Sequence, residues 1–468
     1  MVVAISDEAI EAFKNVCGVE YIETEPEKVD KLSKDFYWYS PVLKPLLEDK
    51  VAGIAVIPQD LEQLKAAVAI CCRNQFPITI RGGGTGNYGQ CVPLHGGVVI
   101  DVSALDRIIS LEDGVARVEP GARLVTIETK AREVGYELRC MPSTFVKSTM
   151  GGFFCGGSGG VGSITWGGIV QGDNVKSVTI LSAEEEPQLV KLEGQDAIKA
   201  LHTYGTNGIM VEIEMRLAPK VDYQQLIFCH EDWNTIFDWT DDFARMDNFK
   251  RRLITGFEDP IPQYFKGLIK NFQEKEHATF ILIAKEQCDE VKSMAEAAGL
   301  RLAYDRPLAD PPRPPYITDY TWNHTTLWAL RADPTITYLQ AGFGTDYKAK
   351  MEKLWAKFPG EILMHIEWTA GNSKMNQEIH RPLTGENVLV GGIPLVRYKS
   401  DERLQEILDY CEEIDVFIAN PHTYFLEEGG LHPDIAEKRA FKDKMDPHSL
   451  LNPGKMKTYP KNPFAQTT

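Results

Sequence analysis

The fold of this chain is decided by the stretch Pro77-Ile-Thr-Ile-Arg-Gly-Gly-Gly-Thr-Gly-Asn-Tyr-Gly-Gln90. An apolar, β-branched run leads directly into a glycine-rich loop, where the backbone can turn sharply and offer N–H groups to an anion. A second glycine block follows farther along the chain, Ser148-Thr-Met-Gly-Gly-Phe-Phe-Cys-Gly-Gly-Ser-Gly-Gly160. Because both blocks stand beside strand-like segments, the pair predicts a long cofactor that is held from two sides.

The first loop also satisfies a pattern that is typical of Rossmann folds, but its surroundings do not fit. Gly84-Thr-Gly-Asn-Tyr-Gly89 reads G-x-G-x-x-G, which should open a helix whose N-terminus holds a pyrophosphate. Here Cys91-Val-Pro-Leu-His-Gly-Gly97 follows, and then a strand-like segment at 98–102, so no helix fits between them. No Lys-Ser/Thr pair follows the glycines. The sequence therefore disfavours a Rossmann fold and excludes a P-loop.

Composition points to an ordinary globular protein. The chain has 468 residues, of which 43% are hydrophobic and 25% charged, so we expect two or three domains. A formal net charge of −17 disfavours nucleic acid and anionic membranes as partners. Nine cysteines without a CxxC pair favour reduced thiols. We find no signal peptide and no apolar run of the ~18 residues that a transmembrane anchor needs, and we expect a cytoplasmic protein.

The two halves of the chain differ in pattern. The first half predicts strands at 52–57, 78–80, 98–102, 115–119, 175–181 and 208–217, with helices beginning at Asp60 and over 124–134. We expect a domain boundary after Pro219. The second half predicts strands at 280–284, 337–343 and 362–368 and helices at 289–298 and 401–411, which indicates an α+β domain. The proline-rich segment 306–315 is either a solvated spacer or the rim of a pocket.

The motifs of the chain resemble one flavoprotein family. They are the loop 81–86, Met141-Pro-Ser-Thr144, the block 151–160 with Trp166-Gly-Gly168, the segment Gly205-Thr-Asn-Gly-Ile-Met-Val-Glu-Ile-Glu-Met-Arg-Leu217, and Asp446-Pro-His-Ser-Leu-Leu-Asn-Pro-Gly-Lys455. In this order they are similar to the FAD-linked proteins of the vanillyl-alcohol oxidase and p-cresol methylhydroxylase type, in the branch of the D-2-hydroxyacid dehydrogenases and the glycolate oxidase flavin subunit. The alternative is that these glycines only make tight turns.

The resemblance implies an α+β fold with a two-subdomain FAD-binding domain and an α+β substrate (cap) domain that contains an antiparallel sheet. The expected division is an N-terminal helical segment (1–45), the FAD-binding domain (46–220), the substrate domain (221–420) and a C-terminal segment that returns to the FAD domain (421–468). The residues that it implies for FAD binding are Arg81, Gly82, Gly83, Gly84, Thr85, Gly86, Asn87, Pro142, Ser143, Thr144, Thr149, Gly151, Gly152, Cys155, Gly159, Gly160, Trp166, Gly167, Ile209 and Asn452.

The predicted mode of FAD attachment follows from the absence of a histidine just after the first glycines. Many relatives carry a histidine just after the first glycines that bonds covalently to the flavin, whereas Thr85 and Gly86 stand there in this chain and His95 lies beyond the loop. Cys155 is the other conceivable tether, although a small buried thiol is its commoner role. We therefore expect FAD to be bound non-covalently.

The resemblance also suggests catalytic residues. Thr326-Leu-Trp-Ala-Leu-Arg331 is similar to the family's Leu-Trp-x-x-Arg segment, whose arginine faces the substrate carboxylate, a task that suits the bidentate guanidinium. Arg331 could instead be a surface ion-pair partner. His324 is a candidate base, against a structural role, and His422 is a further candidate.

A metal site is the point at which the resemblance weakens. Metal-dependent relatives place two histidines around a Gly-Asp-Gly-Asn turn and add a glutamate in a Glu-His-Gly segment. This chain has one histidine in Met364-His-Ile-Glu-Trp-Thr-Ala-Gly-Asn372 and offers His365, His422 and Glu428 as ligands for zinc or another divalent ion, at a different spacing. The alternative is a polar pocket without metal.

The sequence thus predicts an FAD-dependent oxidoreductase that oxidises an alcohol carbon by hydride transfer to flavin N5. The predicted substrate is a small D-2-hydroxy acid such as glycolate or lactate. Oxidation of an aryl alcohol or a sugar lactone is the alternative within the fold, and a flavin-bearing electron-transfer subunit of a larger complex is the alternative outside it. The sequence leaves the electron acceptor open among oxygen, a quinone and a protein, and it leaves the oligomeric state open, with a homodimer as one option.

Overall fold

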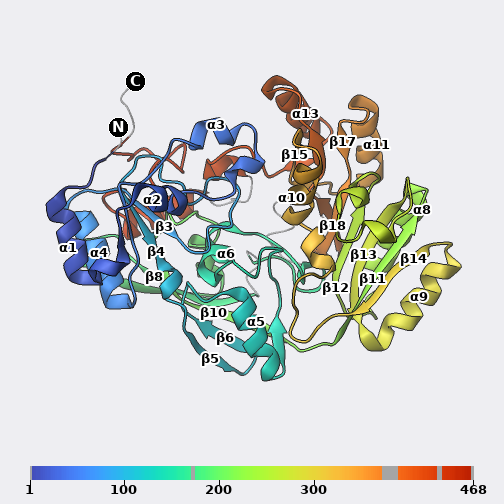
Figure 1. Ribbon diagram of the computed structural model, residues 1–468, viewed down its shortest axis with the longest axis horizontal. Coiled ribbons are helices and arrows are strands. Elements are labelled where there is room, and N and C mark those ends of the chain that lie inside the picture. The colour runs from blue at the N-terminus through green and yellow to red at the C-terminus, as the bar shows by residue number, and fades with distance from the viewer. Residues whose placement is uncertain (1–2, 170–173, 372–387, 430–434, 465–468) are drawn as a thin grey trace.

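The computed structural model describes residues 3–169, 174–371, 388–429 and 435–464. It shows a mixed α and β architecture in which the first and second halves of the chain lie side by side (Figure 1). The mixed architecture agrees with the predicted α+β class.

A small mixed sheet carries the first glycine loop. In the described residues its strands lie in the order β1 (Ile22–Glu23), β2 (Ile54–Val56), β4 (Val98–Asp101) and β3 (Ile78–Arg81), with β1 antiparallel to β2 and with β2 and β3 both parallel to β4. Helices α1 (Asp7–Cys17) and α4 (Leu61–Arg73) pack beside it (Figure 1). Asp60 caps α4 as predicted, because its side chain accepts from the Gln63 N–H at 2.8 Å. The Gln63 side chain accepts from Gln59, one residue before a capping box would place it.

The predicted helix-free stretch after the first loop is confirmed. Residues 87–97 form turns and lead straight into β4, so the Rossmann arrangement is absent from this described segment. The second glycine block, in contrast, is not only a loop. It forms the short helix α6 (Met150–Gly156), which Thr149 caps through a bond from the Gly152 N–H, followed by α7 (Ser163–Trp166).

A second, antiparallel sheet completes the first half. Its described strands are β5 (Ile108–Glu112), β6 (Val115–Val118), β10 (Ile209–Pro219), β8 (Val175–Leu181) and β9 (Leu189–Glu193) in spatial order, and β7 (Tyr136–Leu138) also pairs with β10. Helix α5 (Leu124–Glu133) packs on this sheet through Leu124, Ile127 and Ala131, all fully buried.

The second half is built on a large antiparallel sheet. Its described strands are, in spatial order, β14 (Arg301–Pro307), β11 (Tyr223–His230), β13 (His277–Ala284), β12 (Arg251–Phe257), β18 (His365–Ala370), β19 (Val388–Gly392), β16 (Ala341–Gly342) and β21 (Phe417–Ile418). A second apolar core joins these strands to α8 (Trp233–Ala244), α9 (Cys288–Ala297), α11 (Tyr347–Lys357) and α13 (Asp401–Glu413). Figure 1 shows these helices on the outer side of the sheet.

Two predicted strands are each divided in the structure. The segment 337–343 contributes β15 (Ile336–Tyr338) to a separate three-stranded sheet with β17 (Ile362–Leu363) and β20 (Leu395–Arg397), and β16 to the large sheet. The segment 362–368 divides at Met364. The backbone of Met364 bonds to Glu258 instead. The N–H of Met364 donates to the side chain of Glu258 at 2.6 Å, and the N–H of Glu258 donates to the carbonyl of Met364 at 2.9 Å. Met364 therefore belongs to neither β17 nor β18.

The C-terminal residues lie against the first glycine loop. The carbonyl of Leu450 accepts from the N–H of Ile78 at 2.7 Å, and the N–H of Asn452 donates back to the carbonyl of Ile78 at 2.7 Å. The remaining described helices are α2 (Pro26–Leu32), α3 (Leu43–Leu47), α10 (Asn323–Ala332) and α14 (Ile435–Met445). Of the helices in the described residues, none has the length and apolarity that crossing a bilayer requires.

Candidate active site

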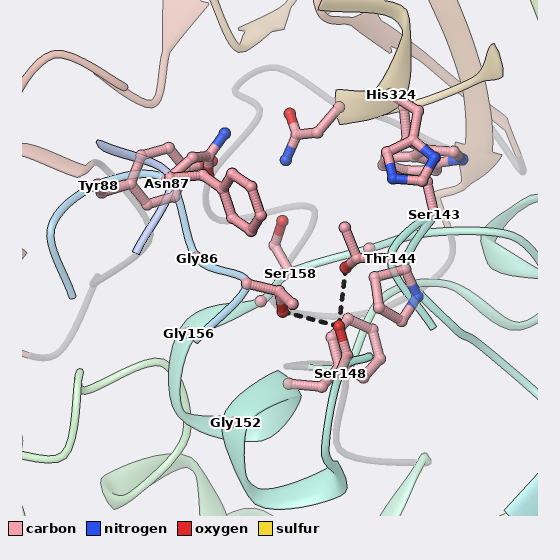
Figure 2. A pocket seen from close by; sticks show the side chains of 18 of the residues that line it. Gly86, Asn87, Tyr88, Ser143, Thr144, Ser148, Gly152, Gly156, Ser158 and His324 are labelled. Carbon is pink, nitrogen blue, oxygen red and sulfur yellow. Dashed lines mark hydrogen bonds between the residues drawn. The ribbon is translucent and has the colours of Figure 1, made fainter. Parts of the chain in front are cut away.

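A large cavity of about 870 Å³ lies where the two halves face each other. One side is made by the two glycine blocks, and the other by α10 and the strands β16, β18 and β19. Figure 2 shows the arrangement, with Gly86, Asn87 and Tyr88 on one side, His324 on the other and α6 below. The predicted cofactor residues that line it are Gly82, Gly83, Gly84, Thr85, Gly86, Asn87, Pro142, Ser143, Thr144, Thr149, Gly151, Gly152, Cys155 and Gly159.

The two glycine blocks pack directly against each other. A Cβ atom on Gly82 would lie 2.3 Å from the hydroxyl oxygen of Thr149, and one on Gly83 would lie 2.3 Å from the carbonyl oxygen of Lys147. No side chain fits at either position, because real Cβ contacts are longer. The glycines therefore bring the two loops together, as well as leaving backbone exposed to the cavity.

A cluster of hydroxyl groups faces the cavity beside the loops. The Oγ atom of Ser148 lies 2.8 Å from Oγ1 of Thr85 and 2.7 Å from Oγ1 of Thr144 (Figure 2). Hydroxyls and free backbone N–H groups near glycines are the donors that a pyrophosphate needs. This part of the cavity is therefore chemically suited to the phosphates of a dinucleotide.

Six of the predicted cofactor residues do not line the cavity: Arg81, Gly160, Trp166, Gly167, Ile209 and Asn452. Arg81 supports the first loop from behind, donating to the carbonyls of Leu32 and Lys34. Ile209 is buried in the core, and its neighbour Met210 lines the cavity instead. Asn452 donates to the carbonyls of Gln90 and Tyr204, both at 2.7 Å, and so ties the C-terminal segment to cavity-lining residues.

The other three, Gly160, Trp166 and Gly167, lie at the end of the second glycine block and just after it. A Cβ on Gly160 would lie 2.0 Å from the carbonyl of Met141, which makes this glycine a packing requirement. The ring of Trp166 packs under the guanidinium of Arg139 at 4.4 Å, and Gly167 ends α7 at a φ of +72°.

Helix α10 carries two of the three predicted catalytic residues into the cavity. Both His324 and Arg331 line it. Burial lowers the pKa of His324 to about 4, so its imidazole is neutral at physiological pH. The guanidinium of Arg331 lies 5.1 Å from the ring centre of Trp328 and has no hydrogen bond or ion pair with the described residues. The surface ion-pair alternative for Arg331 has no partner in that part of the chain.

His422 does not take part in this site. Its Nδ1 lies 2.8 Å from Oγ of Ser40 and its Nε2 lies 2.9 Å from the carbonyl of Tyr338. Burial lowers its pKa to about 4, so it is a neutral, hydrogen-bonded histidine that joins the N-terminal segment to β15. It does not line the cavity.

The three predicted metal ligands are not brought together. His365 contacts Glu367 at 2.9 Å, His422 contacts Ser40, and Glu428 accepts from Thr423 at 2.7 Å. Each is thus engaged in a separate hydrogen-bond network. Across the described residues, no group of three His, Cys, Asp or Glu side chains is placed to hold a metal ion. Asn372, the last residue of the motif that suggested this site, lies outside the described residues.

Three carboxylates that sequence reasoning did not assign to the site line the cavity: Asp35, Asp319 and Glu367. Asp35 precedes the matched motifs, and no pattern in the sequence singles it out. Glu367 stands two residues after His365 on β18, so strand alternation puts both on one face and could have indicated it. The proline-rich segment contributes Pro314 and Pro315 to the lining, which supports the pocket-rim alternative.

The surroundings of Asp35 also indicate whether a cofactor fits in the cavity. It is 7% exposed, its Oδ1 accepts from the Tyr37 N–H at 3.0 Å, and its Oδ2 has no hydrogen-bond partner among the described residues. A buried carboxylate oxygen without a partner costs free energy. A ligand that carries hydroxyl or N–H donors, as FAD does, would satisfy it.

Comparisons with known proteins agree with the site. Residues 52–188 match the FAD binding domain family. The glycolate oxidase subunit GlcD of Escherichia coli K12 is 26% identical over 227 residues, 47% of this chain and 43% of that protein. A D-lactate dehydrogenase of Anaerostipes hadrus is 26% identical over 231 residues, 46% of this chain and 45% of that protein. The chain therefore matches somewhat less than half the length of these curated relatives.

Solved structures extend the similarity to the whole fold. A structure of alkyldihydroxyacetonephosphate synthase matches with a TM-score of 0.73, covering 97% of this chain and 86% of that chain at 14% identity. Together these findings confirm the resemblance drawn from the motifs. The chain has an α+β FAD-binding fold that is similar to the p-cresol methylhydroxylase type, and FAD is its cofactor.

Proposed function

We propose that this flavoprotein is an FAD-dependent oxidoreductase that oxidises the alcohol carbon of a small 2-hydroxy acid. The observation that carries the proposal is that Arg331 and His324 line the same cavity as the two glycine blocks. The names of the relatives, a glycolate oxidase subunit and a D-lactate dehydrogenase, support the same class of substrate. In this proposal residues 221–420 form the substrate domain over the FAD-binding part.

The first half of the chain would hold the cofactor. The Ser148 hydroxyl cluster and the N–H groups of the glycine loops face the phosphates, and Gly84 and Gly159 allow close approach of the backbone. When bound, FAD supplies the acceptor for a hydride from the substrate carbon. The protein has to orient the substrate, exclude water and take up the hydroxyl proton.

Arg331 would bind the substrate carboxylate. Arg331 lines the cavity, and a guanidinium can form two parallel hydrogen bonds to a carboxylate. The stacked ring of Trp328 restricts the motion of the side chain. His324 lies seven residues, about two turns, earlier on the same helix and, being neutral, can hydrogen-bond to the substrate without repelling Arg331.

A second candidate function has one observation in its favour. The substrate side of the cavity is walled by aromatic rings, those of Tyr320, Trp322 and Trp328. Flat apolar rings suit the oxidation of an aryl alcohol, or of a sugar derivative that stacks on them. An aryl alcohol would leave Arg331 without an anionic partner in the substrate, which is why the 2-hydroxy acid is preferred.

The test is an anaerobic titration of the purified holoprotein with a panel of 2-hydroxy acids, aryl alcohols and sugars, followed by flavin absorbance. We expect bleaching by at least one D-2-hydroxy acid. Bleaching only by uncharged alcohols would favour the second candidate function, the oxidation of an aryl alcohol or a sugar derivative. A flavin that dithionite reduces and none of the compounds reduces would favour an electron-transfer subunit. Repeating the reaction in air shows whether oxygen accepts the electrons.

A further inference from the structure

Glu367 is a buried carboxylate on the substrate side of the cavity. Alternate residues of a strand share one face, and on β18 these are His365, Glu367 and Thr369. Glu367 and Thr369 line the cavity, whereas His365 lies beneath them. The side chains of Glu367 and His365 are almost completely buried, at 2% and 0% exposure.

Three donors hold the carboxylate of Glu367 in place. Its Oε2 accepts from the hydroxyl of Thr255 at 2.6 Å, and its Oε1 accepts from the backbone N–H of Trp322 at 2.8 Å. Nε2 of His365 lies 2.9 Å from the same Oε1. A carboxylate offers about four acceptor positions, so one is left unused by the described residues. The group is therefore fixed in orientation and still able to accept one more hydrogen bond.

Trp322 connects this carboxylate to the second glycine block. Its indole ring packs on Gly159, where a Cβ atom would lie 3.0 Å from Cη2 of the ring. The backbone of Trp322 has a φ of +52°, uncommon for a non-glycine residue, and this conformation supports the N–H bond to Glu367. Glu367 thus stands where the start of α10, strand β18 and the proposed cofactor loop meet.

His365 is suited to hold Glu367 in position. Its Nδ1 is buried and has no hydrogen-bond partner among the described residues, and its ring stacks on Phe257 at 4.9 Å. A proton on Nδ1 would be buried without an acceptor, which is costly. The hydrogen on Nε2 therefore points to Glu367, and His365 is a fixed hydrogen-bond donor to that carboxylate.

We propose that Glu367 is a catalytic residue that hydrogen-bonds to the reacting hydroxyl of the substrate and accepts its proton. His365 is its positioning residue. In the reaction the substrate O–H bond breaks and its proton moves to the Glu367 carboxylate, while the hydrogen of the carbinol carbon leaves with two electrons to the bound FAD. The alcohol becomes a carbonyl group. His324 keeps the role of a hydrogen-bond partner of the substrate.

This inference rests on the proposed oxidation of an alcohol carbon, and the Glu367→Gln variant of the full FAD-bound chain tests it. The amide preserves size and hydrogen bonding but cannot take the proton. We expect normal FAD content, a substrate Kd within about threefold of wild type, and an anaerobic rate of flavin reduction that falls about 10²–10⁴-fold, the range typical of general base catalysis. Dithionite should reduce both proteins alike.

The matched control is Glu258→Gln. Glu258 is another largely buried glutamate of the second half, bonded to Met364 and Trp355, and it does not line the cavity. Its flavin should be reduced at the wild-type rate. If Glu367→Gln loses FAD or does not fold, Glu367→Asp is measured instead, which keeps the acid but withdraws it from the substrate. We expect its reduction rate to fall at least about tenfold at unchanged substrate Kd.

The outcomes separate this inference from the proposed function. A reduction rate in Glu367→Gln or, where that variant is unusable, Glu367→Asp within about threefold of wild type would overturn the role of Glu367 and leave the function standing. If only an uncharged alcohol reduces the wild type, the 2-hydroxy-acid function fails, and the same variants are compared with that alcohol. If no alcohol reduces the wild type, both proposals are wrong.

Discussion

Arg81 fills the space beside Gly84 so closely that a Cβ atom on Gly84 would lie 2.0 Å from Nη2 of Arg81. Gly84 also has a φ of +60°, which side chains rarely adopt. Gly84→Val should therefore displace Arg81, strain the loop and lower FAD affinity at least about tenfold, since strain of this kind costs ~1–3 kcal/mol. The ratio of flavin to protein absorbance in the purified variant, with a titration of the apoprotein by FAD, measures the effect.

Gly194 provides the matched control for this prediction. It has a similar φ of +55°, but a Cβ atom there would meet no atom within 4 Å, and it does not line the cavity. Gly194→Val should keep its FAD.

In the second block Gly151→Val should lose FAD as Gly84→Val does, because its Cβ would lie 2.6 Å from Pro120. Normal occupancy in both loop variants would show that these loops only turn the chain.

The FAD should be released when the protein is denatured by acid. Thr85 and Gly86 offer no nucleophile to the flavin, and His95 lies outside the cavity, stacked near Phe464 at 5.7 Å. Cys155 does line the cavity, but burial raises its pKa to about 12, so its thiol is protonated and unreactive. After precipitation with acid the yellow colour should stay in the supernatant. Colour that remains in the pellet of the wild type but not of Cys155→Ser would identify a cysteine tether.

Asp35 should contribute to FAD affinity. Asp35 lines the cavity, its Oδ2 has no hydrogen-bond partner among the described residues, and a Cβ on Gly86 would lie 3.5 Å from that oxygen. Asp35→Asn replaces an acceptor with a donor, and we expect FAD to bind about tenfold more weakly, consistent with hydrogen bonds to charged groups. The exposed Asp49→Asn is the control. Unchanged FAD affinity with a lower melting temperature would mean that Asp35 serves only the neighbouring charges of Arg81 and Lys455.

The sequence predicted best the parts of the fold that depend on local signals. The strands at 78–80, 98–102 and 175–181 and the helix at 401–411 have their positions in the structure because apolar periodicity, caps and glycines act over a few residues. The division of 362–368 into β17 and β18 could not be predicted in this way. It depends on the bonds of Met364 to Glu258, a residue far away in the sequence.

The candidate site shows the same difference between local signals and contacts of residues far apart in the sequence. The glycine loops could be assigned from their composition, and most of their residues line the cavity. Asp35 and Glu367 were missed because they reach the cavity only through folding of distant segments, and no short motif marks them. The metal prediction relied on residue types without knowledge of their neighbours. In the structure Ser40, Thr423 and Glu367 satisfy the three residues separately.

Glu258 should make stability depend on pH. Burial raises its pKa from 4.5 to about 7, so the folded protein holds the proton more tightly than the unfolded chain. Stability should therefore fall as the pH rises from about 4.5 to 7, and Glu258→Gln should lack this loss. We expect the variant to be more stable than wild type at pH 8 by on the order of 1–3 kcal/mol, and not at pH 4.5, in urea unfolding. Exposed Glu290→Gln is the control; an equal difference at both pH values would contradict the assignment.

The remaining prediction concerns Arg331 as the anchor of an anionic substrate. Two variants separate its charge from its shape, and each is compared with wild type using one active substrate from the titration. Arg331→Lys keeps the charge but loses the planar fork, so it should still lower kcat/KM. Arg306→Ala, which removes an exposed arginine of β14 that does not line the cavity, is the control and should behave as wild type.

Arg331→Ala should have the larger effect. The substrate carboxylate would enter a cavity of aromatic rings without its charge partner, and charge-assisted hydrogen bonds of this type are worth ~1.5–3 kcal/mol. Steady-state kinetics should show kcat/KM lowered about tenfold to hundredfold on a 2-hydroxy acid, while an uncharged alcohol, if it reacts at all, is affected little. Flavin content should not change, because Arg331 belongs to α10 and not to the glycine loops. Full activity of the alanine variant on a carboxylate substrate would remove Arg331 from the site and leave the 2-hydroxy-acid assignment without its anchor.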